Sequence, residues 1–139
     1  MIKDWKLGID YVWPLKRYRI TDYFHMPSRP NHDGDDLCGE VGDEVFSCFS
    51  GRVFGIYKSG APGGMTVDII NFDGIRATYS HLDHVMLDKG QDVAMGQMIG
   101  VLGAYPADKP RPHIHFQLWV DGEWVNPSQT LQMPKHWGV

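Results

Sequence analysis

The chain has 139 residues, of which 42% are hydrophobic and 12% aromatic, and this composition fits one globular domain with its own core. The formal net charge of −4 argues against binding to nucleic acid or to an anionic surface through bulk charge. The sequence contains no run of about 18 apolar residues, so we expect no membrane-spanning helix.

The N-terminal segment has neither an apolar run nor a small-residue cleavage site, so we expect no signal peptide. Export by another route, or earlier removal of a leader, would account for this. Residues 1–12 are expected to form an arm whose aromatic side chains pack on the core, and residues 132–139 a peripheral tail. The whole chain, residues 1–139, is predicted to be a single domain.

Glycine and proline divide the chain into short segments. Sixteen Gly and nine Pro favour an all-β fold with frequent turns. Asp73-Gly74 is a good turn signal and predicts a hairpin between the strands on either side of it. The strands that we expect cover residues 19–24, 44–49, 51–57, 65–70, 75–80 and 113–118, with tight turns and small strands over 89–100 and a last hairpin over 120–125.

The segment from His32 to Leu37 places a histidine beside three aspartates. Gly34 and the lack of helical periodicity argue against a helix, and in an extended segment the even spacing of His32 and Asp36 puts both on one side. Such a cluster is either a solvated loop or a set of metal ligands. An Asp-rich calcium loop is disfavoured, because the regular ligand spacing and its closing Glu are missing.

Two further segments carry histidines that are candidates for a site. His113 and His115 alternate with apolar residues as in a half-buried strand, so both imidazoles point to one face, about 6–7 Å apart. Neutral imidazole is a good zinc ligand, although a His-x-His in a strand is also found without a function. His81 follows the end of a predicted strand, where sites are often built, and an ordinary surface residue is the alternative.

The other chemistry-bearing residues have ordinary explanations. Cys38 and Cys48 are interpreted as small buried thiols, with a bridge between neighbouring strands or zinc ligation by Cys38 as alternatives. Trp119 and Trp124 are expected to pack in the core, with a platform for a glycan or a peptide as the alternative. Surface or packing positions are expected for His25, His84 and His136.

Five motifs occur in register: His-x-Gly-x-Asp at residues 32–36, Tyr-x-His-Leu at 79–82, Lys-Gly-x-x-Val-x-x-Gly-Gln-x-Ile-Gly at 89–100, Pro-His-x-His-Phe at 112–116 and Asn-Pro at 126–127. In these motifs and in their order, about residues 13 to 131 resemble the lysostaphin/LytM-type zinc endopeptidases, which cleave the peptide part of bacterial peptidoglycan. Any one motif is modest evidence, and together they indicate membership of that family.

The resemblance implies a compact antiparallel β-sandwich of the duplicated hybrid motif type, with a groove over a metal. It implies that His32, Asp36 and His115 ligate one zinc ion, and that His81 and His113 form a second pair near the bound water but off the metal. Zinc with three protein ligands keeps an open position for water, polarises the scissile carbonyl and lowers the pKa of the water toward about 7. Imidazole titrates near pH 6.5, so the second pair suits proton transfer and stabilisation of the charged intermediate.

Three positions depart from the pattern of the family. His25 follows Phe24 where the family often has Gly-x-Arg, residues 107–111 replace a Ser-Thr-Gly segment, and Gln117 replaces a common Glu. None of these is an implied ligand. Because the first two concern the walls of the groove, we expect them to affect substrate preference more than catalysis.

We therefore predict a zinc-dependent endopeptidase that hydrolyses peptide bonds in peptidoglycan stem peptides or crosslinks, acts on the bacterial cell wall and is a monomer. A phage or prophage lytic enzyme, or a tail-associated one, would suit a leaderless single domain, and cellular wall remodelling is the other use. A glycine bridge and a D-alanyl to diaminopimelate crosslink both stay open as the bond cleaved.

Two other functions are weighed against the peptidase. The first is a noncatalytic relative that binds the wall or regulates an amidase, although such relatives usually lack ligand residues. The second is a phosphocarrier with paired histidines, which would have no use for Asp36.

Overall fold

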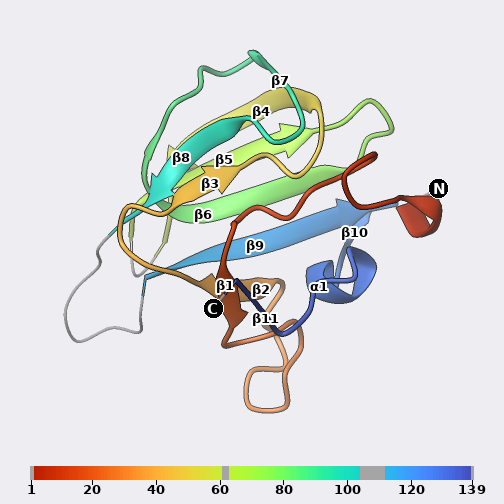
Figure 1. Ribbon diagram of the computed structural model, residues 1–139, viewed down its shortest axis with the longest axis vertical. Helices are drawn as coiled ribbons and strands as arrows, with labels where there is room; N and C mark the ends of the chain where they lie inside the picture. The colour runs from red at the N-terminus through yellow and green to blue at the C-terminus, as the bar shows by residue number, and fades with distance from the viewer. Residues whose placement is uncertain (1, 61–62, 104–111, 139) are drawn as a thin grey trace.

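The computed structural model describes residues 2–60, 63–103 and 112–138, and most of its regular structure is β-strand (Figure 1). None of the helices in these ranges is long and apolar enough to cross a membrane. The elements in chain order are η1 (Ile2–Asp4), β1 (Tyr18–Ile20), β2 (Asp35–Cys38), β3 (Glu44–Phe46), β4 (Gly51–Lys58), β5 (Met65–Ile70), β6 (Arg76–Val85), β7 (Asp92–Val93), β8 (Met98–Leu102), β9 (His113–Val120), β10 (Glu123–Val125), α1 (Pro127–Thr130) and β11 (His136–Trp137).

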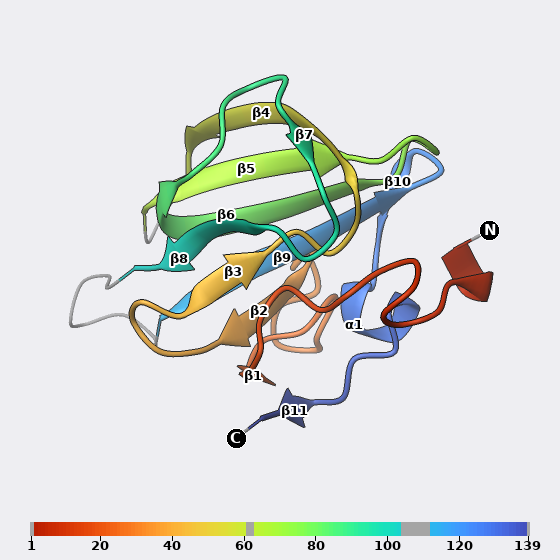
Figure 2. The same cartoon turned by 45° about the horizontal axis from the view of Figure 1, so that its top comes forward.

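The strands form one antiparallel sheet whose main path runs β11-β1-β2-β9-β6-β5-β4-β7 (Figure 2). β10 pairs with β9, and β8 joins β6 to β3. Side chains alternate across β6 and β9, so Tyr79, Phe116 and Leu118 enter the core while the histidines of β9 point to the opposite face. The alternation thus gives these strands one face that packs in the core and an opposite face that carries the histidines of the candidate site.

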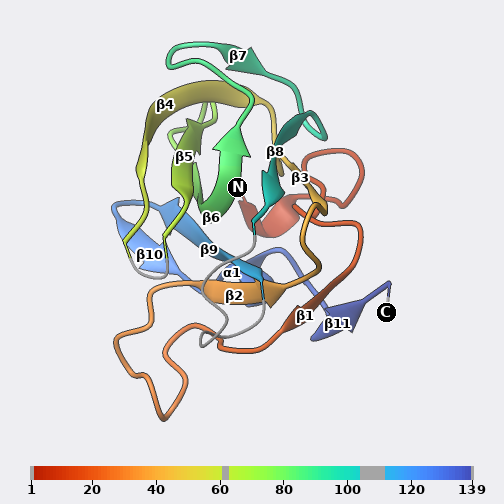
Figure 3. The same cartoon turned by 90° about the vertical axis from the view of Figure 1, so that its left-hand side faces the viewer.

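The sheet curls so that β3 and β8 lie across the core from β4 and β5 (Figure 3). β6 makes this possible, because its first half pairs with β9 and its second half, from Leu82 onward, pairs with β8 across a register shift between Leu82 and His84. Full burial of each large apolar side chain between the layers contributes about 1.5–3 kcal/mol. The largest fully buried side chains are Tyr18, Tyr79, Phe49, Phe116, Leu37, Ile69, Leu82, Ile99, Leu102, Ile114, Leu118 and Leu131.

The predicted all-β, antiparallel fold is confirmed, and the hairpin turn before Ile75 lies where the sequence places it. Asn71 Oδ1 accepts hydrogen bonds from the backbone of Asp73 and Ile75, both at 2.9 Å, and Gly74 has a φ of +80°, which glycine adopts without steric cost. The Asp-Gly signal therefore identified a real β5–β6 connection.

Several strands differ in extent from the prediction, and among them β3 is shorter, ending at Phe46, while β9 continues to Val120. β1 ends at Ile20, although the backbone of the next two residues still contacts β2, since Thr21 N donates to the Asp36 carbonyl at 3.1 Å and Asp36 N donates to the Asp22 carbonyl at 2.7 Å. β6 continues to Val85, so His81 lies within the strand and not after its end.

The sequence gives no expectation of α1, although its cap has a recognisable signal. Asn126 Oδ1 accepts a hydrogen bond from Gln129 N at 3.0 Å, and Pro127 occupies the first helical position. At four residues the helix is too short for a periodic pattern to reveal it.

The N-terminal segment before β1 packs aromatic side chains against the core. The ring of Trp5 lies 5.9 Å from that of Phe49, and the hydroxyl of Tyr11 donates to the carbonyl of Leu131 at 2.9 Å. The C-terminal tail adds an edge strand to the sheet, because β11 pairs with β1 through Trp137 opposite Tyr18.

Asp35 joins the segment before β2 to the start of α1. Its side chain is fully buried, and its two oxygens accept hydrogen bonds from Phe24 N at 2.9 Å and from Ser128 N at 2.8 Å. Two backbone donors satisfy the buried carboxylate and fix the loop that precedes the candidate site.

We predict that Asp35→Ala lowers the free energy of unfolding by about 2–4 kcal/mol, because each unsatisfied backbone donor costs about 1–3 kcal/mol. Urea denaturation in chelator measures this loss without any contribution from metal. Asp88→Ala is the matched control, because Asp88 is exposed. A loss below about 0.5 kcal/mol, the usual range for surface substitutions, would contradict the role given to Asp35.

Candidate metal centre

The pairing of β2 with β9 brings distant parts of the chain together. Asp36 lies opposite His115 and Cys38 opposite His113, while Ser80 of β6 lies on the other side of His115. The Asp36 and His115 side chains, 79 positions apart in sequence, meet at 2.9 Å between Oδ1 and Nδ1.

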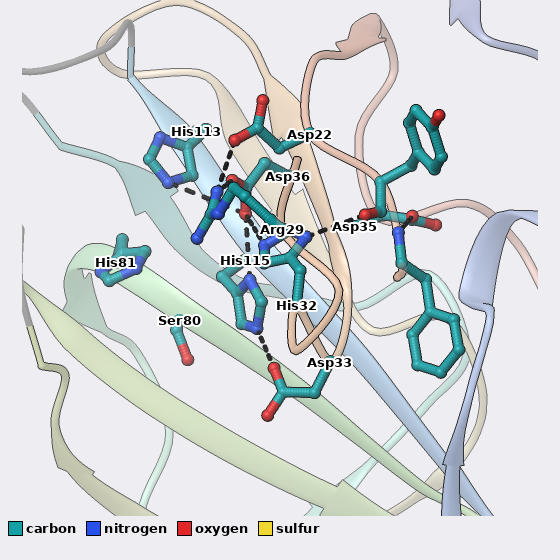
Figure 4. Close-up of polar contacts among 12 residues, drawn as sticks. Asp22, Arg29, His32, Asp33, Asp35, Asp36, Ser80, His81, His113 and His115 are labelled. Atoms are coloured by element: carbon teal, nitrogen blue, oxygen red, sulfur yellow. Dashed lines mark hydrogen bonds and ion pairs between the residues drawn. The ribbon is translucent and has the colours of Figure 1, made fainter. Parts of the chain in front are cut away.

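His32, Asp36 and His115 form the group of candidate metal ligands (Figure 4). One ligand atom from each lies within 4.8 Å of the other two, and His32 Nε2 is 3.3 Å from Asp36 Oδ1. Ligand atoms of a tetrahedral zinc site, with bonds of about 2.0–2.1 Å, are roughly 3.3 Å apart. The spacing therefore suits one small divalent ion.

His32 offers the observation that tests this fit. Its Nδ1 lies 3.1 Å from the carbonyl of Tyr23, which can only accept, so Nδ1 carries the proton and Nε2 has a lone pair. His32 Nε2 is buried and has no hydrogen-bond partner among the described residues. An orphaned basic nitrogen facing a carboxylate and a second imidazole is the arrangement that a metal ion would satisfy.

His115 is held between two carboxylates. Its Nδ1 faces Asp36, and its Nε2 lies 2.9 Å from Asp33 Oδ1. Burial alone lowers the pKa of His115, but the hydrogen bonds and charges of Asp36 and Asp33 outweigh it, and the net pKa is raised. A metal at Nδ1 would replace one proton and leave the bond from Nε2–H to Asp33 intact.

Asp36 lies at the centre of the cluster. Its Oδ1 faces the histidines, with His113 Nε2 at 4.0 Å, and its Oδ2 lies 3.4 Å from Arg29 Nη1. Burial raises the pKa of the Asp36 carboxyl. The hydrogen bond from His115 and the charges of the three histidines lower that pKa by a larger amount, so the net shift is downward. The carboxylate is therefore ionised and ready to act as a ligand near neutral pH.

His81 and His113 lie together beside the ligand group, as the resemblance implied (Figure 4). Their ring centroids are 5.2 Å apart, and that of His81 is 6.5 Å from that of His115. His81 has a φ of +71°, a strained value for a residue other than glycine. Its Nδ1–H donates to the carbonyl of Gly63 at 2.7 Å, which directs Nε2 away from that carbonyl.

Burial lowers the pKa of His81, and the neighbouring His113 and His115 charges lower it further. The hydrogen bond to Gly63 and the charge of Asp36 act in the opposite direction but do not reverse the shift. His81 is therefore neutral at pH 7, with Nε2 able to accept a proton.

Two residues of the site have no role in the sequence-based prediction. Asp33 belongs to the aspartate cluster noted in the sequence, so composition held a signal for it. Arg29 forms ion pairs with both Asp22 and Asp36. The sequence contains no signal for this role, because these contacts depend on how residues 22–36 fold back on themselves.

The remaining titratable groups lie outside the candidate ligand group. Cys38 and Cys48 are both buried, and neither belongs to the metal-ligand group found among the described residues. Burial raises the pKa of Cys48 to about 12, so it is no nucleophile near neutral pH. The other histidines in the described ranges, His25, His84 and His136, are exposed, as expected.

Comparison with known proteins identifies the family of the chain. The model of Peptidase family M23 matches residues 30–127. The peptidoglycan DD-endopeptidase ShyB of Vibrio cholerae is 34% identical over 100 residues, which cover 71% of this chain and 23% of ShyB. The murein hydrolase activator NlpD of Escherichia coli is 28% identical over 121 residues, which cover 86% of this chain and 30% of NlpD. The chain thus spans less than a third of either relative.

Solved structures agree as well. A zinc-containing peptidase from Vibrio cholerae superposes with a TM-score of 0.71 at 29% identity, covering 86% of this chain and 38% of that one. The antimicrobial peptidase lysostaphin from Staphylococcus simulans superposes with a TM-score of 0.69 at 29% identity, covering 83% and 49%. The family model, the fold and the histidine and aspartate motifs agree, and the chain belongs to peptidase family M23, of the lysostaphin/LytM type.

Proposed function

We propose that this chain is a zinc-dependent endopeptidase that hydrolyses peptide bonds of bacterial peptidoglycan. In this proposal His32, Asp36 and His115 hold one zinc ion, and His81 and His113 act beside it. The observation that carries it is the buried Nε2 of His32, which makes no hydrogen bond within the described part of the chain and faces Asp36 together with His115. The similarity to ShyB supports the choice of peptidoglycan as substrate.

Each proposed ligand has a neighbour that prepares it. The Tyr23 carbonyl holds the proton of His32 on Nδ1, and Asp33 holds that of His115 on Nε2, so both ligand nitrogens are directed at the same point. Arg29 contacts the Asp36 oxygen that faces away from the histidines. When bound, zinc supplies Lewis-acid polarisation of the scissile carbonyl and activation of a water molecule.

His81 and His113 have different roles in the proposed reaction, proton transfer and stabilisation of the developing negative charge. Because Gly63 fixes the proton of His81 on Nδ1 and its pKa is lowered, His81 Nε2 accepts a proton from the attacking water and later returns it to the leaving amine. His113 donates an N–H to the negative charge that develops on the carbonyl oxygen. Burial of both rings keeps these interactions away from bulk water, where they would be weaker.

The similarity to NlpD favours a second candidate, a chain that activates another hydrolase and does not cut peptides itself. The complete set of five histidine and aspartate positions supports the peptidase. Incubation of purified sacculi with the protein, with and without chelator, tests the choice. Chelator-sensitive release of new amino termini is expected, and intact sacculi with wild-type, zinc-loaded protein would contradict the proposal.

We predict that His115→Ala abolishes both zinc binding and peptide release, whereas His113→Ala retains zinc and loses activity by at least about 100-fold, in line with the usual contribution of acid–base groups. Metal analysis of the purified variants separates the two. His136→Ala is the control, because His136 is exposed and lies on the edge strand β11, outside the ligand group. A zinc-free His113→Ala protein would reverse the two roles.

We predict that Asp33→Asn weakens zinc binding by about tenfold, because loss of the carboxylate behind a ligating histidine typically costs 10–100-fold in affinity. Competition with a chromophoric chelator gives the dissociation constant. Asp83→Asn removes an exposed aspartate that contacts His84 and should leave zinc affinity unchanged. Equal affinities of Asp33→Asn and wild type would contradict the positioning role.

The raised pKa of His115 predicts a pH effect on the metal-free protein. A folded pKa above the unfolded value of about 6.5 contributes stability that is fully present below pH 6.5 and is lost as pH rises through the folded pKa. The lowered pKa of His81 changes stability with pH in the opposite direction. Wild type and Asp33→Asn both contain His81, so this contribution is common to the two proteins. We therefore expect the wild-type advantage in melting temperature over Asp33→Asn, measured in chelator, to shrink between about pH 6 and pH 8. A wild-type advantage that grows with pH would contradict this assignment.

A further inference from the structure

The face of the sheet that carries the candidate metal centre extends well beyond it. On β9, His113, His115, Gln117 and Trp119 alternate with core residues and share one face. On β6 the residues opposite them are Ser80, Thr78 and Arg76. We call these seven residues the site face.

At the far end of the site face, Arg76 lies among aromatic rings. Its guanidinium carbon is 5.2 Å from the ring centroid of Trp119, 5.3 Å from that of Trp124 and 5.9 Å from that of Phe54. The two tryptophans meet edge to face at 4.9 Å, because β10 places Trp124 opposite Trp119. Strands β4, β6, β9 and β10 thus hold a cation against three π faces.

The charge of Arg76 has no carboxylate partner within the described ranges of the chain, where no ion pair includes it. Its Nε is buried and makes no hydrogen bond there. Asp68, which lies diagonally across β5 and β6, already accepts hydrogen bonds from Thr78 at 2.5 Å and from Tyr57 at 3.2 Å. Although the chain has a net charge of −4, none of the ion pairs among the described residues includes Arg76, so its guanidinium can bind an external anion.

The position of Arg76 relates it to the metal centre. Trp119, opposite Arg76, follows His115 by four residues on the same strand, which corresponds to about 13 Å. An extended peptide covers that distance in about four residues. A substrate cut at the metal centre and lying along β9 would therefore bring a group about four residues from the scissile bond to Arg76.

We propose that Arg76, Trp119, Trp124 and Phe54 form a subsite that binds a carboxylate of the peptide substrate. The inference rests on the proposed function, because it takes the substrate to be a peptidoglycan peptide. Since Nε is buried, the carboxylate meets the two terminal nitrogens, which donate as a pair. The rings hold the guanidinium plane and exclude water, which strengthens the ion pair.

A sugar ring stacked on the tryptophans is the competing occupant. A sugar without a carboxylate would use the aromatic surface but leave the charge of Arg76 unmatched. The carboxylate accounts for both the cation and its aromatic surroundings.

The test uses soluble crosslinked muropeptides released from sacculi, in native form and with their carboxylates converted to carboxamides. Wild type, Arg76→Gln, Arg76→Lys and Arg52→Gln are compared in steady-state hydrolysis. Arg52→Gln is the matched control, because it removes an exposed arginine of β4 that pairs with Asp92. Melting temperatures confirm folding, and Arg76→Lys keeps the charge if the glutamine variant unfolds.

We expect Arg76→Gln to lower kcat/KM about tenfold on the native muropeptides, mainly through KM, and to match wild type on the amidated ones. Arg76→Lys should lie between them, because lysine lacks the paired donors. Equal losses on native and amidated muropeptides would overturn the carboxylate subsite and indicate packing or sugar stacking.

A binding measurement separates this inference from the proposed function. The indole N–H signals of Trp119 and Trp124 are followed by NMR in the His113→Ala protein. Shifts with native but not with amidated muropeptides support the subsite even if wild type shows no hydrolysis, an outcome that would contradict only the peptidase. Equal shifts with both forms, or none with the native form, would overturn the subsite.

Discussion

The site depends on the antiparallel register between β2 and β9. That register places Asp36 opposite His115, and Asp36 Oδ1 then lies within 4.0 Å of nitrogens from three histidines. A slip by one residue would turn Asp36 into the core and expose Leu37, because neighbouring side chains point to opposite faces. The apolar residues that alternate with the histidines, Ile114 and Phe116, hold the register by their complete burial.

Around this pairing, hydrogen bonds fix which nitrogen of each ring carries the proton. The Tyr23 carbonyl, the Gly63 carbonyl and the Asp33 carboxylate each take one N–H, so the other nitrogen of each ring is directed elsewhere. The opposite pKa shifts of His115 and Asp36 have one origin, since each stabilises the charged form of the other against burial. The same contacts that compensate charge in the metal-free protein would orient ligands around a cation.

The pairing of β6 with β9 fixes which further side chains lie beside the site. It sets Ser80 beside His115 and, four residues further along β9, Arg76 beside Trp119. One face of a single strand pair thus carries the proposed catalytic centre and the proposed carboxylate subsite, while its other face forms the core. A substrate that binds along β9 would engage both at once, which links recognition to the position of the scissile bond.

The sequence by itself determined the all-β fold and the hairpin before Ile75, and its resemblance to the lysostaphin/LytM-type peptidases singled out the five polar positions that lie close together in the structure. The alternation of apolar residues, turn-forming residues and motif spacing are local properties of the sequence, so they can be recognised without knowing which strands pair. It did not determine the extent of β6, the helix α1 or the contacts of Arg29, because a strand end and a loop path depend on what packs against them. Only the tertiary structure decided that Asp33 lies behind His115 and that Arg76 lies among three aromatic rings. Those contacts join strands and loops far apart in the chain, and nothing in local spacing encodes which of them become neighbours.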